Sequence, residues 1–424
     1  MYKPRLIDDI LKRKLKGAGA VLIEGLKWCG KTTTAEQHSK SVIYMDNPAN
    51  RNLNIMLAET DPGIILSGET PRLIDEWQLA PTLWDAVRFE VDHRPGEGQF
   101  ILTGSAVPQI SKEEKEKMHT GTGRISRLKM RTMSLWESGD SNGKISLEGL
   151  KEGKKQSAST VSDLYEIAYL CCRGGWPKAT LQDRDISLDR AEDYYQAIVN
   201  FDISRASKSQ IKSQRLKRLL RSYARFQGCQ TSVNAITEDM KFGETDTLDS
   251  RTVQGYIDTL NQIYVIEDMP AWNPNLRSKS AIRTTETRYF SDPSIATASL
   301  GLGPDDLLKD LKTFGFIFET LCVRDLRIYA ENLGGDVYHF RDSNGLECDA
   351  VIHFRNSQYG LIEIKLGGDK LIEEGVRNLL KLRKNIDIER MGEPCFMMVL
   401  TATGEFAFQR PDGIYIVPVR TLKN

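Results

Sequence analysis

The sequence predicts a multidomain α/β protein in which two α/β units flank a helical module. Over the first third of the chain, short apolar runs alternate with helical stretches, which is the rhythm of a parallel sheet with crossover helices. Helical periodicity then dominates from about residue 161 to 300. Beyond it, three strand-like runs, a helix and a fourth strand-like run indicate a second α/β unit. The length of 424 residues fits two or three domains.

Composition sets the predicted boundaries. We expect an α/β domain over residues 1–140. Residues 141–204 combine a stretch rich in Ser, Gly and Lys, interpreted as an exposed linker or insertion, with a helical segment. Residues 205–290 form the predicted helical module. Residues 291–424 form the second α/β domain, which opens with one long amphipathic helix at about 305–333.

The overall composition indicates the class of protein. With 40% hydrophobic and 27% charged residues the chain is typical of soluble globular proteins. Lys and Arg number 58 and Asp and Glu number 58, so attraction to nucleic acid must come from a local patch. The seven cysteines lack CxxC spacing, and we find neither a secretory leader nor an apolar run that could span a bilayer. We therefore expect a cytoplasmic protein with no membrane contact.

A phosphate-binding motif follows the first apolar run. GLKWCGKT, residues 25–32, satisfies GxxxxGK[ST], comes after AVLIE and opens a helical stretch. Glycines at both ends let the backbone N–H groups point at phosphate oxygens, and the helix N-terminus adds a positive dipole. We expect Lys31 to reach the β- and γ-phosphates and the Thr32 hydroxyl to bind Mg²⁺. The predicted nucleotide-binding residues are Gly25, Leu26, Lys27, Trp28, Cys29, Gly30, Lys31, Thr32 and Thr33.

Two adjacent acids end the strand-like run RLIDEW. Asp75 is predicted to share the Mg²⁺ ion with Thr32, and Glu76 to orient and polarise the attacking water. Phosphoryl transfer depends mainly on such positioning and charge neutralisation. Adjacent acids at strand ends are also common surface features, so this interpretation depends on the phosphate-binding motif.

The next apolar run, QFILTGSA, ends in Thr103 and Ser105. Their hydroxyls are candidates for contact with the γ-phosphate or the water, although a plain strand and turn explain the run equally well. Arg124 and Arg131 are candidates for stabilising the charge that develops on the phosphate. In this role they would be presented to the nucleotide of a neighbouring subunit. A solvated surface role for either arginine is the alternative.

Four segments together resemble a known group of proteins. GLKWCGKTT, LIDEWQLAP, ILTGSA and GRISRLKMRTMSLWESG resemble the AAA-superfamily ATPases of bacteria and archaea that carry a C-terminal domain of unknown function. The resemblance extends over nearly the whole chain, through YLCCRGGWPKA, YFSDPSIATASLG and GLECDAVIHF. It implies that ATP is the nucleotide, and it implies no pathway.

A basic stretch opens the helical module. Residues 205–225 contain eight Lys and Arg residues and no acid. Two further helices, the second with Asp249 and Ser250 as N-cap residues, and a strand-like run complete a winged-helix pattern. Such a module can bind DNA by phosphate contacts and a helix in the major groove, or act only as a spacer or protein-contact domain. The candidate DNA contacts are Arg215, Arg218, Arg221 and Arg251.

A carboxylate and lysine set lies in the last domain. Glu319 is on a predicted helix, Asp349 on one strand, and Glu363 and Lys365 on the next. This order resembles the PD-(D/E)XK restriction-endonuclease-like core, with Cys348 in place of the motif's proline. Strand alternation puts Glu363 and Lys365 on one face, where the carboxylates could share Mg²⁺. A half-buried strand with polar residues facing water is the alternative.

These patterns predict a Mg²⁺-dependent ATP-binding protein, a slow ATPase whose nucleotide state controls DNA-binding or nuclease-like modules in the second half of the chain. One alternative is an ATP-gated DNA nuclease. The other is a nucleotide-sensing DNA-binding or signalling scaffold without nuclease activity. The expected cofactors are ATP and Mg²⁺, the candidate partner is DNA, and a homo-oligomer is a candidate assembly.

Overall fold

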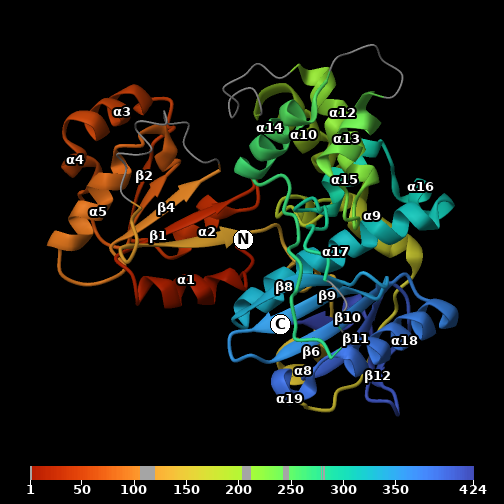
Figure 1. The fold of residues 1–424 in the computed structure, drawn as a ribbon. Helices are drawn as coiled ribbons and strands as arrows, with labels where there is room; N and C mark the ends of the chain where they lie inside the picture. The colour runs from red at the N-terminus through yellow and green to blue at the C-terminus, as the bar shows by residue number, and fades with distance from the viewer. Residues whose placement is uncertain (1, 106–119, 203–211, 242–247, 278, 280–281) are drawn as a thin grey trace. The chain divides into compact units, whose positions relative to one another are not determined.

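The computed structural model describes residues 2–105, 120–202, 212–241, 248–277, 279 and 282–424 (Figure 1). Backbone contacts divide the chain into two units. Unit 1 comprises Met1–Thr132 and Gln262–Tyr264, and unit 2 comprises Met133–Asn261 and Val265–Asn424. Residues 205–211 of the predicted basic stretch lie outside the described residues.

Unit 1 is built on a parallel sheet of five strands in the order β2-β3-β4-β1-β5. The predicted α/β class and N-terminal parallel sheet are therefore confirmed. The elements of the unit, in chain order, are α1 (Ile7–Leu15), β1 (Ala20–Gly25), α2 (Lys31–Gln37), β2 (Ser41–Tyr44), α3 (Arg51–Thr60), α4 (Pro62–Leu66), β3 (Arg72–Asp75), the 3₁₀ turn η1 (Trp77–Leu79), α5 (Leu83–His93), β4 (Phe100–Gly104) and β5 (Ile125–Met130).

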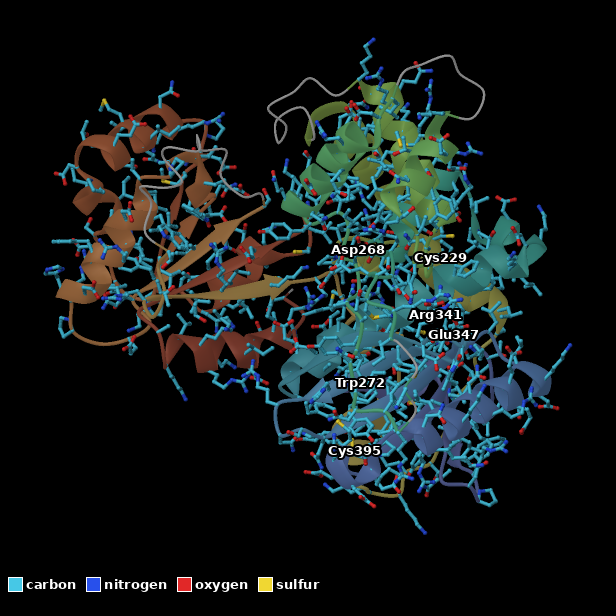
Figure 2. The ribbon with its side chains drawn as sticks, viewed as in Figure 1. Cys229, Asp268, Trp272, Arg341, Glu347 and Cys395 are labelled. Atoms are coloured by element: carbon cyan, nitrogen blue, oxygen red, sulfur yellow. The ribbon has the colours of Figure 1, made fainter. Side chains whose placement is uncertain are left out.

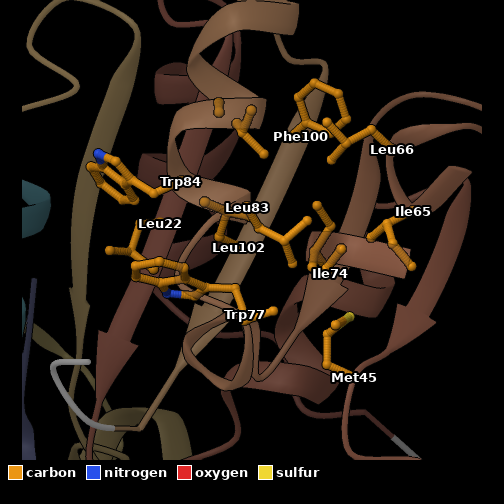
Figure 3. Close-up of a cluster of buried hydrophobic side chains, with 14 of the residues drawn as sticks. Leu22, Met45, Ile65, Leu66, Ile74, Trp77, Leu83, Trp84, Phe100 and Leu102 are labelled. Atoms are coloured by element: carbon orange, nitrogen blue, oxygen red, sulfur yellow. The ribbon is translucent and has the colours of Figure 1, made fainter. Parts of the chain in front are cut away.

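The apolar core of unit 1 packs against the parallel strands β1, β3 and β4. Leu22, Ile74 and Leu102, from three neighbouring strands, pack in one apolar cluster (Figure 3). The ring centroids of Trp77 and Trp84, in the same cluster, are 5.2 Å apart. Because the strands are parallel, the loops that follow β1, β3 and β4 leave the sheet at one edge.

Unit 2 contains a helical part and a large mixed sheet. Figure 1 shows α10, α12, α13 and α15 grouped together. The elements are α7 (Leu135–Ser138), β6 (Ile145–Ser146), α8 (Leu147–Lys151), β7 (Ala158–Ser159), α9 (Leu164–Arg173), η2 (Ala179–Leu181), α10 (Arg184–Ala197), the π-helical turn η3 (Ile198–Asp202), α12 (Ser213–Arg225), α13 (Val233–Lys241), α14 (Ser250–Gln262), α15 (Pro293–Leu300), α16 (Pro304–Lys309), α17 (Leu311–Asn332), β8 (Gly335–Arg341), β9 (Glu347–Phe354), β10 (Tyr359–Lys365), α18 (Asp369–Asn385), α19 (Ile388–Met391), β11 (Phe396–Thr401), β12 (Phe406–Gln409), β13 (Tyr415–Pro418), η4 (Val419–Thr421) and β14 (Leu422–Lys423).

The seven-stranded sheet of unit 2 has the order β7-β12-β13-β11-β10-β9-β8. Strands β8, β9 and β10 are antiparallel neighbours, whereas β10, β11 and β13 run parallel. Helix α17 packs on β8, β9 and β10, and α18 packs on β9, β10 and β11. Val376, Leu379 and Leu382 of α18 belong to the apolar cluster that covers the sheet. The second half of the chain is thus a mixed α/β structure.

Two predictions about unit 2 were wrong. The stretch interpreted as an exposed linker belongs to the unit, because Ile145, Leu147 and Leu150 are buried and β6 pairs with β14 near the C-terminus. The single helix expected at about 305–333 is two helices, α16 and α17. The helix is interrupted at Asp310, whose carboxylate accepts a hydrogen bond from the Thr313 N–H at 3.1 Å and so caps α17.

The predicted helical module contains α12, α13 and α14 in succession. Two antiparallel bridges follow, Ile266 with Phe290 and Met269 with Thr287. The winged-helix assignment of this segment stays a prediction. In the described part of the chain, no helix has both the length and the apolar character that a membrane span requires.

Candidate functional site

The phosphate-binding motif forms the turn between β1 and α2. Gly25 has a φ of 153° and Gly30 a φ of 102°, a region that favours glycine. A Cβ atom at Gly25 would lie 2.1 Å from the Met130 carbonyl oxygen of β5, so the turn has no room for a side chain there. The glycines therefore allow a tight loop that begins at the end of β1 and leads into a helix N-terminus.

Lys31 is the first residue of α2, and its side chain extends into this loop. Its side chain is buried, and Nζ donates hydrogen bonds to the carbonyl oxygens of Gly25 at 2.9 Å and Leu26 at 2.6 Å. The ammonium group is thus held at the centre of the turn by two neutral acceptors. Phosphate oxygens would offer charged acceptors at the same place, and hydrogen bonds between charged groups are the stronger kind.

Asp75, the last residue of β3, connects this strand to β4 and to the first turn of α2. The Thr32 hydroxyl donates to Asp75 Oδ1 at 2.8 Å, and the Thr103 hydroxyl donates to the same oxygen at 2.5 Å. Thr103 reaches Asp75 because β4 lies between β1 and β3. Burial raises the pKa of Asp75, while the two hydroxyl hydrogen bonds lower it. A buried carboxylate beside a hydroxyl is a suitable pair of oxygen ligands for Mg²⁺.

Glu76 follows Asp75 in a left-handed backbone conformation with a φ of 55°. The Gln78 amide donates to its carboxylate, and the Ser105 hydroxyl lies 3.4 Å from Oε2. Burial raises the pKa of Glu76, and the positive charge of Lys31 opposes this rise. A raised pKa makes a carboxylate a better proton acceptor, which suits a group that polarises water.

The sequence interpretation missed Asp46. It follows β2, which is the neighbour of β3, and the Met45 N–H donates to the Asp75 carbonyl oxygen at 3.1 Å. The negative charge of Asp46 raises the pKa of both Asp75 and Glu76. The sequence does contain a signal for Asp46, because an acid directly follows the strand-like run SVIYM, which ends at the same edge of the sheet as RLIDEW.

The remaining predicted residues of unit 1 lie in different surroundings. Trp28 is exposed and Cys29 is fully buried. Lys27 is half-buried and Thr33 is exposed. They occupy the loop and the first turn of α2.

Arg124 does not reach the phosphate-binding loop of its own chain. It precedes β5, whose first residue pairs with Ala20 at the start of β1, whereas the loop follows the end of β1. Its guanidinium group pairs with Asp92 at 2.9 Å. The role of Arg124 as a charge stabiliser, presented to the nucleotide of a neighbouring subunit, therefore stays a prediction.

The second candidate cluster lies in unit 2. Lys365 Nζ is 3.0 Å from Asp349 Oδ2 and 2.7 Å from Glu363 Oε2. Glu363 is 1% exposed, and neither of its carboxylate oxygens accepts a hydrogen bond of normal geometry from the described residues. Burial and the charge of Asp349 raise the pKa of Glu363, whereas Lys365 lowers it. The structure thus brings one ammonium and two carboxylates together.

Glu319 of α17 lies in the same region, beside a cavity of about 40 Å³. The Tyr289 hydroxyl donates to Glu319 Oε1. Arg341 and Glu347, labelled in Figure 2, also line the cavity, and their charged groups are 3.5 Å apart. A cavity of this volume holds a few water molecules and is too small for a nucleotide.

Among the described residues, no group of three or more His, Cys, Asp or Glu side chains is arranged to hold a metal ion. A cation at either cluster would therefore complete its coordination with water or with substrate oxygens. Mg²⁺ commonly binds in this way, through one or two carboxylates.

The Glu319 carboxyl group is expected to make stability depend on pH. Burial and the charge of Asp349 raise its pKa to about 8. The folded protein therefore keeps a proton that the unfolded chain releases near pH 4.5, so stability falls as pH rises between these values. We expect Glu319→Gln to lose less thermal stability than the parental protein between pH 5 and 8, measured by thermal unfolding monitored by circular dichroism.

The matched control for this prediction is Glu286→Gln, which changes an exposed glutamate of the same unit. It should follow the parental pH dependence. Parallel pH profiles for Glu319→Gln and the parental protein would contradict the assignment of a raised pKa to Glu319.

The candidate DNA contacts lie on two helices. Helix α12 buries Leu216, Leu219 and Leu220. Arg221 is exposed on this helix, whereas Arg215 and Arg218 are half-buried. Arg251 is exposed near the start of α14. Their role as DNA contacts stays a prediction.

Three stretches of the chain match models of known protein domains. Residues 18–138 match the model of an AAA domain. Residues 164–306 and 314–422 match two domains of unknown function, DUF8612 and DUF4143. The AAA match covers β1, the phosphate-binding loop and Asp75, and it supports a P-loop ATPase.

Whole-chain relatives are similar to the protein over most of its length. Uncharacterized proteins of Mycobacterium bovis and Mycobacterium tuberculosis are each 23% identical over 415 residues, which covers 96% of this chain and 82% of the relative. Among solved structures, a Walker-type ATPase of Pyrococcus abyssi matches with a TM-score of 0.43 and 12% identity over 69% of this chain and 94% of its own. A signal transduction ATPase with a tetratricopeptide repeat sensor from Pyrococcus horikoshii matches with a TM-score of 0.20 and 11% identity, over 78% of this chain and 54% of its own.

Proposed function

We propose that the protein is a Mg²⁺-dependent ATP-binding protein and a slow ATPase, whose nucleotide state controls DNA-binding or nuclease-like modules in unit 2. The observation that carries the proposal is the meeting of Lys31, Thr32, Asp75 and Glu76 at one edge of the parallel sheet. The hydrogen bond from Thr32 to Asp75, at 2.8 Å, connects the end of the phosphate-binding loop to the acidic pair. This is the set of groups that phosphoryl transfer to water requires.

Each residue has a defined task in this proposal. Lys31 and the N–H groups of the loop bind the triphosphate. Thr32 and Asp75 hold Mg²⁺, which neutralises phosphate charge when it is bound. Glu76 orients water and accepts its proton, and the Gln78 amide holds the Glu76 carboxylate in place. Thr103 and Ser105 position Asp75 and Glu76 through their hydroxyl groups.

The test is isothermal titration calorimetry of the purified protein with ATP and with GTP, each with and without Mg²⁺. Binding of ATP that strengthens with Mg²⁺ supports the proposal. The absence of binding heat with both nucleotides, in the presence of Mg²⁺ and at several temperatures, would overturn it. Several temperatures are required because a binding enthalpy can pass through zero at one of them.

The coupling to DNA is tested separately. ATP turnover is measured with and without duplex DNA, at two salt concentrations because phosphate contacts weaken with salt. If DNA stimulates ATP turnover and the stimulation decreases at higher salt, the nucleotide site and the DNA-binding module are coupled. A DNA-independent rate with salt-sensitive DNA retention would favour the scaffold alternative.

The cluster of Asp349, Glu363 and Lys365 favours a second candidate function, an ATP-gated DNA nuclease. Its specific observation is the ammonium of Lys365 between two carboxylates, one of them fully buried. The carboxylates would hold a divalent cation, and Lys365 would stabilise charge on the phosphate or help to activate water.

If this second function operates, Asp349→Ala is expected to abolish cleavage of plasmid and linear DNA in Mg²⁺ or Mn²⁺, because it removes one of the two carboxylates that would hold the cation. Cleavage is followed on agarose gels, and ATP turnover should stay at the parental level. Asp336→Ala, which changes an exposed aspartate on β8, is the matched control. Cleavage that persists in Asp349→Ala would assign the activity to a contaminant and remove the nuclease candidate.

A further inference from the structure

The N-terminal segment before α1 contacts the phosphate-binding loop. Arg5 is 7% exposed, and its guanidinium group donates three hydrogen bonds to backbone carbonyl oxygens. Nη1 donates to Cys29 at 3.0 Å, and Nη2 donates to Arg131 at 3.0 Å and to Thr132 at 3.1 Å. Cys29 belongs to the loop, whereas Arg131 and Thr132 follow β5. One side chain therefore fastens the loop to the end of the neighbouring strand.

The same segment also contacts the helix that follows the loop. The Tyr2 hydroxyl donates to Asp8 Oδ1 at 2.7 Å and lies 3.1 Å from the Thr34 hydroxyl of α2. His38, at the end of α2, lies 3.1 Å from the same Asp8 oxygen. The Arg5 N–H donates to the other oxygen of Asp8 at 2.8 Å. Asp8 thus links Arg5 to α2, and the N-terminal residues contact the chain on both sides of Lys31, at Cys29 and at Thr34.

The loop requires such support because its backbone is strained at Trp28. This residue has a φ of 63°, while its side chain is 54% exposed. A bulky residue in the left-handed region is strained, and this conformation persists only where surrounding contacts fix it. The next residue, Cys29, is fixed on both sides, because Arg5 binds its carbonyl oxygen and its thiol lies 3.6 Å from the Met130 carbonyl oxygen.

We propose that Arg5 is a positioning residue of the nucleotide site, which holds the phosphate-binding loop in the left-handed Trp28 conformation that binds the triphosphate. This inference rests on the proposed ATP binding of unit 1. A loop that is already fixed in its binding conformation loses less conformational entropy when the ligand binds. Removing Arg5 therefore weakens nucleotide binding even though the guanidinium group itself bonds to the protein backbone.

The test measures the dissociation constant for Mg²⁺-ATP by titration calorimetry, at a temperature well below thermal unfolding. We expect Arg5→Ala to bind ATP about 10- to 100-fold more weakly, the range that loss of one hydrogen bond to a charged group produces. Arg5→Lys, which keeps a cation, should be intermediate. Arg13→Ala removes an exposed arginine of α1 and should bind like the parental protein.

Two further measurements separate positioning from a loss of folding. Circular dichroism establishes that Arg5→Ala is folded at the temperature of the titration, and Arg5→Lys replaces it if it is not. Guanidinium ion at millimolar concentration should partly restore ATP binding to Arg5→Ala and leave Arg13→Ala unchanged. A purely structural role would lower the melting temperature without changing the affinity of the folded protein, and that result would overturn the inference.

The failure of this inference is distinguishable from the failure of the proposed function. If the parental protein does not bind ATP, the proposed function is wrong and the Arg5 question has no basis. If the parental protein binds ATP and Arg5→Ala and Arg5→Lys bind it equally well, nucleotide binding stands and the positioning role of Arg5 is wrong.

Discussion

Replacement of Lys31 by alanine is expected to abolish detectable ATP binding. The side chain is buried at the centre of the phosphate-binding loop, where Nζ bonds to the carbonyl oxygens of Gly25 and Leu26. Its charge is the strongest attraction that the loop offers to a triphosphate. Each charge-assisted hydrogen bond contributes about 1.5–3 kcal/mol, so two lost phosphate contacts reduce the affinity by about 100-fold or more. Titration calorimetry with Mg²⁺-ATP measures this loss.

Two controls accompany the Lys31→Ala measurement. Lys40→Ala removes an exposed lysine just after α2 and should bind ATP like the parental protein. Lys31→Met keeps most of the side-chain length without the charge, and it should lose binding as Lys31→Ala does. If either Lys31 variant retained the parental affinity, the nucleotide would not be bound by this loop.

Local motifs carried enough information to predict which residues meet at the end of β1 and β3. The spacing from Gly25 to Thr32 defines one turn of the chain, and the acids of RLIDEW end a strand. Parallel strands then bring their carboxyl ends to one edge, and for that reason Thr103 on β4 reaches Asp75 on β3. A prediction of this kind requires only that the sheet is parallel and that the ends of its strands are known.

Contacts between distant parts of the chain could not be predicted in the same way. Arg5 bonds to carbonyl oxygens more than 120 residues away, and no local pattern around it indicates this role. Arg124 is a candidate charge stabiliser from its place in the segment GRISRLKMRTMSLWESG. Its position depends on where β5 begins, and it comes before the strand, at the edge of the sheet away from the loop.

The predicted domain of residues 291–424 illustrates a second limit. Apolar periodicity runs on through residues 305–333, so it predicted one helix. At Asp310, which accepts hydrogen bonds from the N–H and the hydroxyl of Thr313, the chain leaves α16 and begins α17. The strand order of unit 2 likewise depends on pairings such as that of β7 with β12, which join segments more than 200 residues apart in the chain.

The largest effect on turnover is expected from Glu76→Gln. The variant should bind Mg²⁺-ATP within about threefold of the parental protein, because the phosphate-binding loop, Thr32 and Asp75 are unchanged. Its turnover should fall by about 10²- to 10⁴-fold, the usual contribution of a general base. Glutamine keeps the shape of the side chain and an oxygen for the Gln78 amide, but it cannot accept a proton from water.

Three measurements make the Glu76 prediction decisive: the ATP affinity by calorimetry, the release of inorganic phosphate, and the melting temperature. Because burial raises the pKa of Glu76, its charged form is disfavoured in the folded protein, so the neutral variant should be as stable as the parental protein or slightly more stable at pH 7. Glu69→Gln, at an exposed turn, should leave turnover unchanged. Parental turnover in Glu76→Gln would assign the water-polarising role to another group, and loss of ATP binding in a folded variant would instead make Glu76 part of the nucleotide-binding contacts.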